Sequence, residues 1–361
     1  MSMQVPVTPD DAAVPHHNAE LTIEQRETEG LSQGAIVRRR FVRHKGAMAA
    51  SAVLIFTIVF VYSSVGFSPF GVSIPGWWRW DYASTSVIVN GGAPTWVLPF
   101  DFGTHPFGQD EIGRDIFARV MRGTQQSILV MVLYGIIAGA LGVVVGALSG
   151  YFRGWIDNVL MRVTDLIIVI PVLVIAAVIG RSIGGQGALM LGVLLGLVGW
   201  TGLARLVRGE FLSLREREFV DAARVAGASH LRIVFRHILP NAVGVVIVSM
   251  TLLMSAAILL EAAISFLGFG IQLPDVSLGQ IINEYQGAFA TRPWLFWWPG
   301  LLIVVLVLCI NFIGDGLRDA FDPRQKRGAA QTGIAAFMGR ALRPARVGSD
   351  SDSDTQGRQP R

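Results

Sequence analysis

The sequence predicts an all-α integral membrane protein with six transmembrane helices. Of its 361 residues, 52% are hydrophobic and only 16% are charged, and the mean hydropathy is +0.51. Soluble domains carry about 25% charged residues, so the deficit of charge indicates a chain that lies in lipid. The apolar residues also gather in runs of about 20, the length that a helix needs to cross a bilayer.

Six apolar runs carry the predicted spans. They are residues 47–67, 127–149, 157–180, 188–208, 241–262 and 296–316. The first begins too far from residue 1 for a cleaved signal peptide, so we expect it to be retained. In the second run, glycines recur at helical spacing from Gly135 to Gly150. This spacing predicts close packing of helix backbones.

Basic side chains set the expected orientation, because short cytoplasmic loops carry an excess of Lys and Arg. They gather before the first span (38–45), around the fourth loop (205–236) and after the last span (318–327). Six spans place all three groups on one side of the membrane. The N- and C-termini are therefore expected in the cytoplasm, together with the loop 209–240.

The polar segments complete a four-part organisation. Residues 1–34 are expected to be a disordered cytoplasmic tail, 35–126 the first transmembrane helix plus a Trp-rich extracytoplasmic segment, 127–327 a core domain, and 328–361 a second cytoplasmic tail. The outer segment contains Trp77, Trp78 and Trp80. An aromatic belt at the membrane interface is the favoured interpretation of these tryptophans, and ligand contact is the alternative.

The stretch Asp221–Asn241, DAARVAGASHLRIVFRHILPN, is too ordered for a plain connection. A helix of small residues is expected to end at Gly227, which can take a positive φ. A second helix would carry Leu231, Val234, Phe235 and Ile238 as one apolar stripe. A docking surface for a partner is one interpretation, and a loop on lipid headgroups is the other. The candidate docking residues are Asp221, Ala222, Ala223, Arg224, Gly227, Ala228 and Arg232.

The same stretch resembles the cytoplasmic EAA loop of bacterial ABC importer permeases, whose pattern is E-A-A, three residues, G, nine residues, I-x-L-P. Asp221 stands in place of the Glu, the two alanines and Gly227 fit, and His237 replaces the Ile. The ending HILPN is similar to that of the peptide-permease branch. Four further stretches resemble dipeptide and oligopeptide permeases of the C type, over about residues 35–327: HPFGQDEIGRDIFARV (105–120), GYFRGWIDNVLMRVTD (150–165), EAAISFLGFGIQLP (261–274) and NFIGDGLRDAFDPR (311–324).

The resemblance implies the type I ABC importer permease fold in the bacterial inner membrane. It implies half of a pathway for di- or oligopeptides, formed with a second, homologous permease. It also implies one or two cytoplasmic ABC ATPases, docked through residues 215–240, and an extracytoplasmic peptide-binding protein; no nucleic-acid partner is expected. ATP and magnesium would be bound by the ATPases, because the only lysines, Lys45 and Lys326, fit no P-loop. No cofactor and no catalytic residue are expected in this chain.

Ionisable residues inside predicted spans are functional candidates. Asp165 is expected to pair with Arg162, three residues before it. Glu261 lies about 20 residues into the fifth span, or about 30 Å at about 1.5 Å per residue, which predicts a position at the outer mouth. There it would either line an outer vestibule near the amino group of the peptide or be solvated at the interface.

Metal binding is not expected. His230 and His237 could share a helix face, but no carboxylate or cysteine completes a ligand set. The single cysteine, Cys309, excludes a disulfide within the chain.

Three alternatives remain open from the sequence. The same architecture could import nickel complexes, glutathione or another small solute. A secondary transporter would show mid-span carboxylates and an inverted repeat, neither of which is clear. A non-transporting membrane anchor would tolerate charged substitutions in its spans.

Overall fold

A computed structural model describes residues 33–67, 73–96, 103–182 and 187–321 of the chain. Helices make up its regular structure, and the described residues contain isolated β-bridges but no named strand. The all-α prediction is confirmed. Residues 1–32 and the expected tail 328–361 lie outside the described residues.

Within the described residues, four continuous helices are long and apolar enough to cross a membrane. They are α3 (Lys45–Ser64), α4 (Ile116–Phe152), the run His230–Phe266 and α13 (Trp294–Phe321). Two bent pairs also pass this test: α5 (Gly154–Val169) with α6 (Val172–Ser182), bent by 74°, and α7 (Gly187–Gly199) with α8 (Thr201–Leu214), bent by 41°. If each pair is one span, the helices account for all six predicted spans; the orientation of the termini stays a prediction.

The break between α5 and α6 follows from Pro171. Proline has no amide hydrogen to donate, and it disfavours helical backbone in the residue before it. Ile170 accordingly takes extended angles, with φ −84° and ψ 119°. The apolar run 157–180 therefore forms two helices at a sharp angle instead of one straight span.

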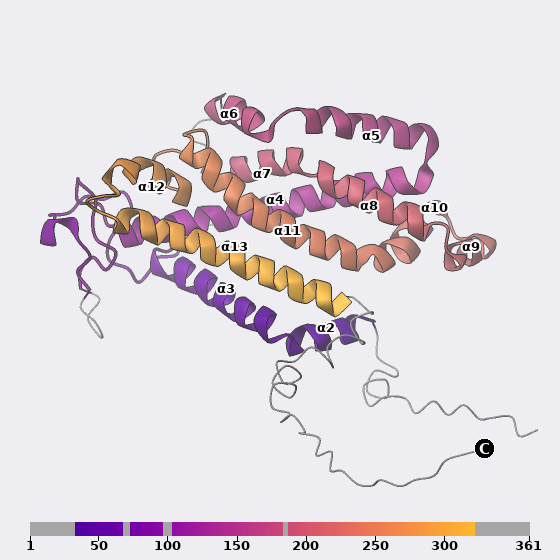
Figure 1. The fold of residues 1–361 in the computed structure, drawn as a ribbon, viewed down its shortest axis with the longest axis horizontal. Helices are drawn as coiled ribbons and strands as arrows, with labels where there is room; N and C mark the ends of the chain where they lie inside the picture. Colours follow the sequence, from indigo (N-terminus) through magenta and orange to yellow (C-terminus); the bar gives the residue numbers. More distant parts are fainter. Residues whose placement is uncertain (1–32, 68–72, 97–102, 183–186, 322–361) are drawn as a thin grey trace, which may run out of the picture. The chain divides into compact units, whose positions relative to one another are not determined.

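α4 lies at the centre of the described fold and packs against α7, α8 and α11, while α13 packs against α11 and α3 (Figure 1). The glycines of α4 make these contacts close. Gly142, Gly146 and Gly150 face α8, where an added Cβ would lie 2.7–2.8 Å from a side-chain carbon. Gly135 and Gly139 face methionines of α11. The predicted close packing of helix backbones is confirmed.

α4 begins at Ile116, eleven residues before the predicted second span, so the expected boundary between 126 and 127 falls inside a helix and is wrong. The physical reason lies in its first turns. Arg119, Gln125, Gln126 and Ser127 are buried there and bond to other segments of the chain. The prediction from apolar runs left these polar residues out of the span. In the structure their side chains form hydrogen bonds, so the helix can include them.

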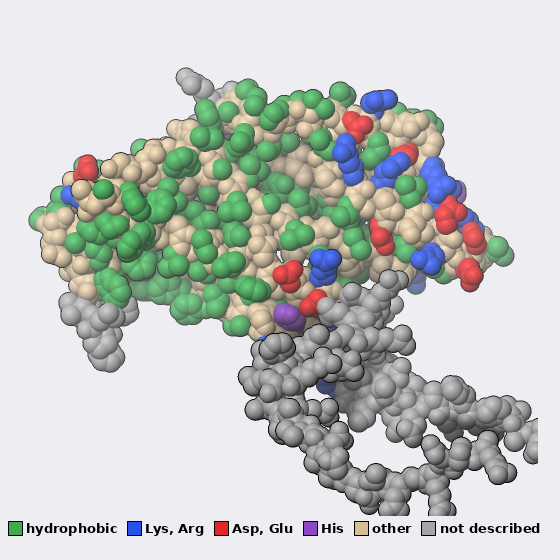
Figure 2. All heavy atoms as spheres, viewed as in Figure 1, with side chains coloured by type: hydrophobic (Ala, Val, Ile, Leu, Met, Phe, Trp, Pro, Cys, Tyr) green, Lys and Arg blue, Asp and Glu red, His purple; other side chains and the backbone are tan. Residues whose placement is uncertain are grey.

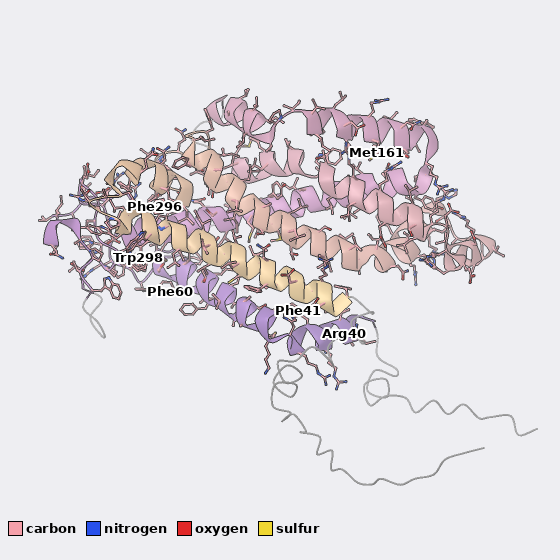
Figure 3. The ribbon with its side chains drawn as sticks, viewed as in Figure 1. Arg40, Phe41, Phe60, Met161, Phe296 and Trp298 are labelled. Carbon is pink, nitrogen blue, oxygen red and sulfur yellow. The ribbon has the colours of Figure 1, made fainter. Side chains whose placement is uncertain are left out.

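The expected loop 209–240 is also shorter than predicted, because α8 continues to Leu214 and the next long helix begins at His230. The remaining helices are short: α2 (Gln33–Arg43), η2 (Asn90–Gly92), α9 (Glu218–Val225), α12 (Leu278–Tyr285) and η4 (Gln286–Ala288). α2 packs on the end of α13, where the Arg40 guanidinium donates to the Ala320 carbonyl at 3.4 Å (Figure 3).

The Trp-rich segment packs against the start of α4. The Trp78 indole donates to Asp115 at 2.9 Å, and the Trp80 indole donates to the Thr104 carbonyl at 3.0 Å. Asp115 also contacts the buried His105 at 2.7 Å. These bonds give both indole groups partners within the chain, and the interfacial position of the tryptophans stays a prediction.

Candidate functional site

α9 forms the first helix of the segment predicted to dock a partner. It ends at Val225, two residues before Gly227, whose φ of +77° lies in the left-handed region that favours glycine. The amide of Gly227 donates to the carbonyl of Arg224, and the amide of Ala228 donates to that of Ala223, both at 3.0 Å. This pair of bonds is a Schellman ending. The predicted turn at Gly227 is confirmed.

The candidate docking residues separate into two faces. Val220 and Ala223 of α9 are buried in a cluster with Phe211 of α8 and Ile233, so Ala223 faces the core of the chain itself. Ala228 is half-buried, and the other five are exposed: Asp221, Ala222, Arg224, Gly227 and Arg232. Val225, which the sequence did not single out, is 90% exposed and lies beside them. An open surface of small residues with charges at its edge is therefore present.

Charged side chains of this segment already have partners within the chain. The Arg224 guanidinium lies 2.8 Å from the Asp221 carboxylate, and Arg153 lies 2.8 Å from Glu216. Figure 2 shows acidic and basic side chains gathered at the end formed by α8, α9 and α10 (His230–Arg232). Any charge pair with a docked protein would thus compete with, or extend, an existing pair.

The second predicted helix differs from expectation in two ways. It is continuous with the fifth span, from His230 to Phe266. Its buried residues are Ile233, Val234 and Ile238, whereas Leu231 and Phe235 are 59% and 48% exposed, so the stripe predicted from α-helical spacing is wrong.

A π-helical turn, η3 (Ile233–Ile238), lies inside this continuous helix and accounts for the changed stripe. The Leu239 amide donates to the Val234 carbonyl, five residues before it, which widens the turn and brings positions 233 and 238 onto one face. Pro240, which has no amide hydrogen, follows at once in α11 (Leu239–Phe266).

Asp165 does not pair with Arg162, as the sequence predicted, but with Arg205 of α8, at 2.5 Å. The spacing of three positions would allow a pair within α5, but α8 packs against α5 and brings Arg205 to Asp165. Nearer the start of α5, Arg208 of α8 holds Asp157 with two contacts of 2.6 Å. α5 and α8 are therefore joined by two ion pairs that only the fold brings together.

Glu261 is fully buried, so both expectations of an exposed carboxyl group are wrong. Ser127 of α4 donates to one carboxyl oxygen at 2.6 Å, and Ser265 of α11 donates to the other at 2.8 Å. The sequence could not show that α4 covers this side of α11. Glu261 joins the two helices in the described structure.

A second polar cluster, at the start of α4, was missed as a site by reasoning from the sequence. The fully buried Arg119 contacts Glu284 of α12 at 2.5 Å, and Tyr285 donates to Asp110 at 2.8 Å. Burial raises the pKa of the Asp110 carboxyl, but hydrogen bonds from Arg114 and Tyr285 outweigh it and hold that pKa below its ordinary value. The motif 105–120 was the available signal, and its polar residues tie α4 to α12.

Among the described residues, no group of three His, Cys, Asp or Glu side chains could hold a metal ion. His230 instead contacts the Tyr151 hydroxyl at 2.8 Å through its Nδ1 atom. The exposed residues around α9 and Gly227 are thus anchored to α4 and α8.

Comparison with known proteins agrees with this architecture. Residues 142–327 match the family described as "Binding-protein-dependent transport system inner membrane component". The chain is 37% identical over 300 residues to the oligopeptide transport system permease protein OppC of Mycobacterium tuberculosis, covering 83% of this chain and 97% of that protein. It is 36% identical over 304 residues to OppC of Haemophilus influenzae, covering 84% and 93%.

A putative peptide permease of Brucella ovis is 40% identical over 255 residues, which cover 70% of this chain and 82% of that protein. Among solved structures, the MetNI methionine ABC transporter in an inward-facing conformation aligns with a TM-score of 0.48 and 22% identity, over 57% of this chain and 98% of that one. The family model spans more than half of the chain, and the OppC relatives span most of it. The chain therefore belongs to the family of binding-protein-dependent transport system inner membrane components.

Proposed function

We propose that the chain is one of two permease subunits of an ATP-driven importer of di- or oligopeptides. The observation that carries the proposal is the match to OppC of Mycobacterium tuberculosis over 97% of its length, because a subunit of the same extent can serve in the same kind of assembly. The substrate class comes from those relatives alone. Nickel complexes, glutathione or another small solute are the alternatives within the same architecture.

The exposed part of α9 would dock an ABC ATPase. Ala222 and Gly227 leave room for a close approach, and Val225 offers an apolar side chain that is 90% exposed. Covering such an exposed apolar side chain with a partner removes it from water and so favours binding. The partner would supply the ATP and magnesium sites, since neither lysine of this chain belongs to a P-loop.

A second permease subunit would pack on the exposed apolar side chains near the two ends of α5 and leave the pair Asp165–Arg205 open. Thr164 is the buried residue of this helix, and Trp155 and Val169 are 75% and 79% exposed. Lipid could cover apolar side chains equally well. The pair Asp165–Arg205 argues against lipid on this side, because both side chains are about half exposed and charges inside a span are expensive to place in hydrocarbon.

Co-purification through a tag on this chain tests the assembly. We expect a second permease and one or two P-loop ATPases in the purified complex. Proteoliposomes that contain the complex and the binding protein should then accumulate dipeptide when ATP is supplied, and liposomes without ATP are the control. Accumulation of nickel complexes or glutathione in place of peptide would select the alternative, and recovery of the chain without any ATPase would contradict the importer function.

A further inference from the structure

An ion pair lies inside two candidate spans and is open to the surroundings of the chain. Asp165 lies eleven residues beyond the start of α5, about 16 Å along the helix, and Arg205 lies nine residues before the end of α8, about 13 Å. Their carboxylate and guanidinium are 2.5 Å apart, and the two side chains are 48% and 50% exposed. Charged side chains within a span are expensive to place in hydrocarbon, so such a pair indicates a wet or covered surface.

The exposed side of α8 supports a wet surface over a lipid-facing one. Its exposed residues include Gly202, Leu206 and Gly209 around Arg205, so one apolar side chain, 42% exposed, lies among small and charged residues, whereas Leu203 and Val207 are buried. α3 shows the opposite pattern. Its exposed side chains include Ile55, Phe56 and Val59, which are 61–67% exposed, as expected for a helix that contacts lipid.

The two patterns occur on different sides of the described fold. α11 and α13 lie between α5 and α3 in Figure 1. In Figure 2, acidic and basic side chains lie together over α5 and α8, whereas hydrophobic side chains cover α12 and the adjoining part of α13. Arg162 of α5, one turn before Asp165, is also exposed and adds a second positive charge. The charged surface therefore carries both signs, with an excess of positive charge.

We infer that the surface formed by Asp165 and Arg205 with Arg162 lines the water-filled pathway and contacts the charged ends of the peptide during transfer. A free peptide carries one ammonium and one carboxylate group, and a carboxylate–guanidinium pair can exchange its partners for those two groups. Arg205, supported by Arg162, receives the peptide carboxylate, and Asp165 receives the ammonium group. The contact is weak because a solute must also leave the pathway, as in channels. This inference rests on the proposed function.

Cysteine accessibility tests whether the surface is wet. The single native cysteine is removed as Cys309→Ser, and Gly209→Cys is introduced one turn from Arg205, where an added Cβ meets no atom within 4 Å. Val59→Cys on α3 is the matched control in a lipid-facing position. We expect a charged, water-soluble methanethiosulfonate to modify Gly209→Cys in the assembled complex and to block uptake, and to leave Val59→Cys unmodified. An unreactive Gly209→Cys, whether covered by lipid or by a packed subunit, would overturn the inference.

Paired substrates test the charge contacts. In proteoliposomes, Arg205→Gln should lower uptake of a dipeptide with a free carboxylate about fivefold, and should leave uptake of its C-terminal amide close to the wild-type rate. The factor corresponds to about 1 kcal/mol, the size of one hydrogen bond. Asp165→Asn should lower uptake of the free-amine peptide and spare the N-acetylated one. Because each variant is compared with the wild type on the same peptide, the preference of the binding protein cancels.

The two kinds of failure are distinguishable. Equal losses for free and blocked peptides in both variants would show a structural role for the pair and overturn the contact with substrate. A wild-type complex that moves no peptide at all would contradict the proposed function instead. The accessibility of Gly209→Cys would still decide whether the surface lines the pathway, because the reaction with the reagent needs no peptide.

Discussion

Gly227 shows how one residue can set the shape of the proposed docking surface. Its φ of +77° ends α9, and an added Cβ would meet no atom within 4 Å. A substitution there is opposed by the backbone conformation and not by lack of space. The left-handed conformation costs a residue with a side chain about 1–2 kcal/mol, and a β-branched residue tolerates it least.

Gly227→Val should therefore disturb the end of α9 without damage to the helices of the core. A cost of about 1–2 kcal/mol shifts an equilibrium about 5- to 30-fold. We expect the variant to reach the membrane normally, to retain less ATPase on co-purification and to lose transport. Gly268→Val is the matched control, since Gly268 has a φ of +80° and equally open space at the end of α11. Equal retention of the ATPase in both variants would contradict the docking role of Gly227.

Single residues also mark the limit of sequence-based inference in this chain. Arg205 and Asp165 are 40 positions apart, and Ser127 and Glu261 are 134 apart, yet each pair is in direct contact. Helical spacing identifies neighbours within one helix only. It therefore pointed to Arg162 as the partner of Asp165, and it left Glu261 without one.

At the scale of elements, three contacts tie the docking segment to the corner between α4 and α5. The Tyr151 hydroxyl contacts Nδ1 of His230 at 2.8 Å, and the Tyr151 carbonyl accepts a hydrogen bond from Arg215. Arg153, which joins α4 to α5, pairs with Glu216. Tyr151 is only 4% exposed and lies at the end of α4. Through its contact with His230, it joins this buried helix end to the first residue of the long helix His230–Phe266.

A movement of α9 should reach α4 through Tyr151. Tyr151→Phe removes the hydroxyl but keeps the ring and the carbonyl, so about 1 kcal/mol of coupling is lost and the fold remains. We expect normal ATPase binding and about fivefold less peptide moved per ATP hydrolysed, measured in proteoliposomes. The double variant with His230→Ala should be no worse than His230→Ala alone, because both substitutions remove the same contact.

Tyr134→Phe provides the control for the Tyr151 variant. Tyr134 lies in the same helix and is also buried, at 6% exposure, but it packs near Gly199 of α7, far along α4 from the docking segment. The Tyr134→Phe variant should change the rates of transport and of ATP hydrolysis by the same factor. If both phenylalanine variants give the same ratio of transport to hydrolysis, the contact between Tyr151 and His230 carries no coupling.

The central part of each span was predictable from the sequence, because a run of apolar residues alone defines it. The turn at Gly227 was predictable because glycine favours a positive φ at the end of a helix. The extension of α4 back to Ile116 was not predictable, because its polar residues are stabilised by partners in α12 and in the segment before it. The π-helical turn at 233–238 was also missed. Its hydrogen bond joins residues five positions apart, so the turn holds more residues than the α-helical turn from which the apolar stripe was predicted.

At the scale of the whole molecule, charge distribution and exposure give a consistent picture of the membrane. Apolar side chains are exposed along α3, and charged residues gather at the end that holds α9. The positive-inside rule places that end in the cytoplasm, where an ATPase could reach it. This orientation is a prediction that single cysteines can test, because the chain has only Cys309 to remove.

In a Cys309→Ser background, Ala226→Cys reports on the α9 end and Ala83→Cys on the Trp-rich segment; both alanines are exposed. A maleimide that cannot cross the membrane should label Ala83→Cys in cells whose inner membrane is accessible, and should label Ala226→Cys only in inverted vesicles. The ATPase should also protect Ala226→Cys in the assembled complex, because position 226 follows the helix proposed to dock. Labelling of both cysteines from one side would contradict the odd number of crossings expected between them, and with it the position of the docking surface.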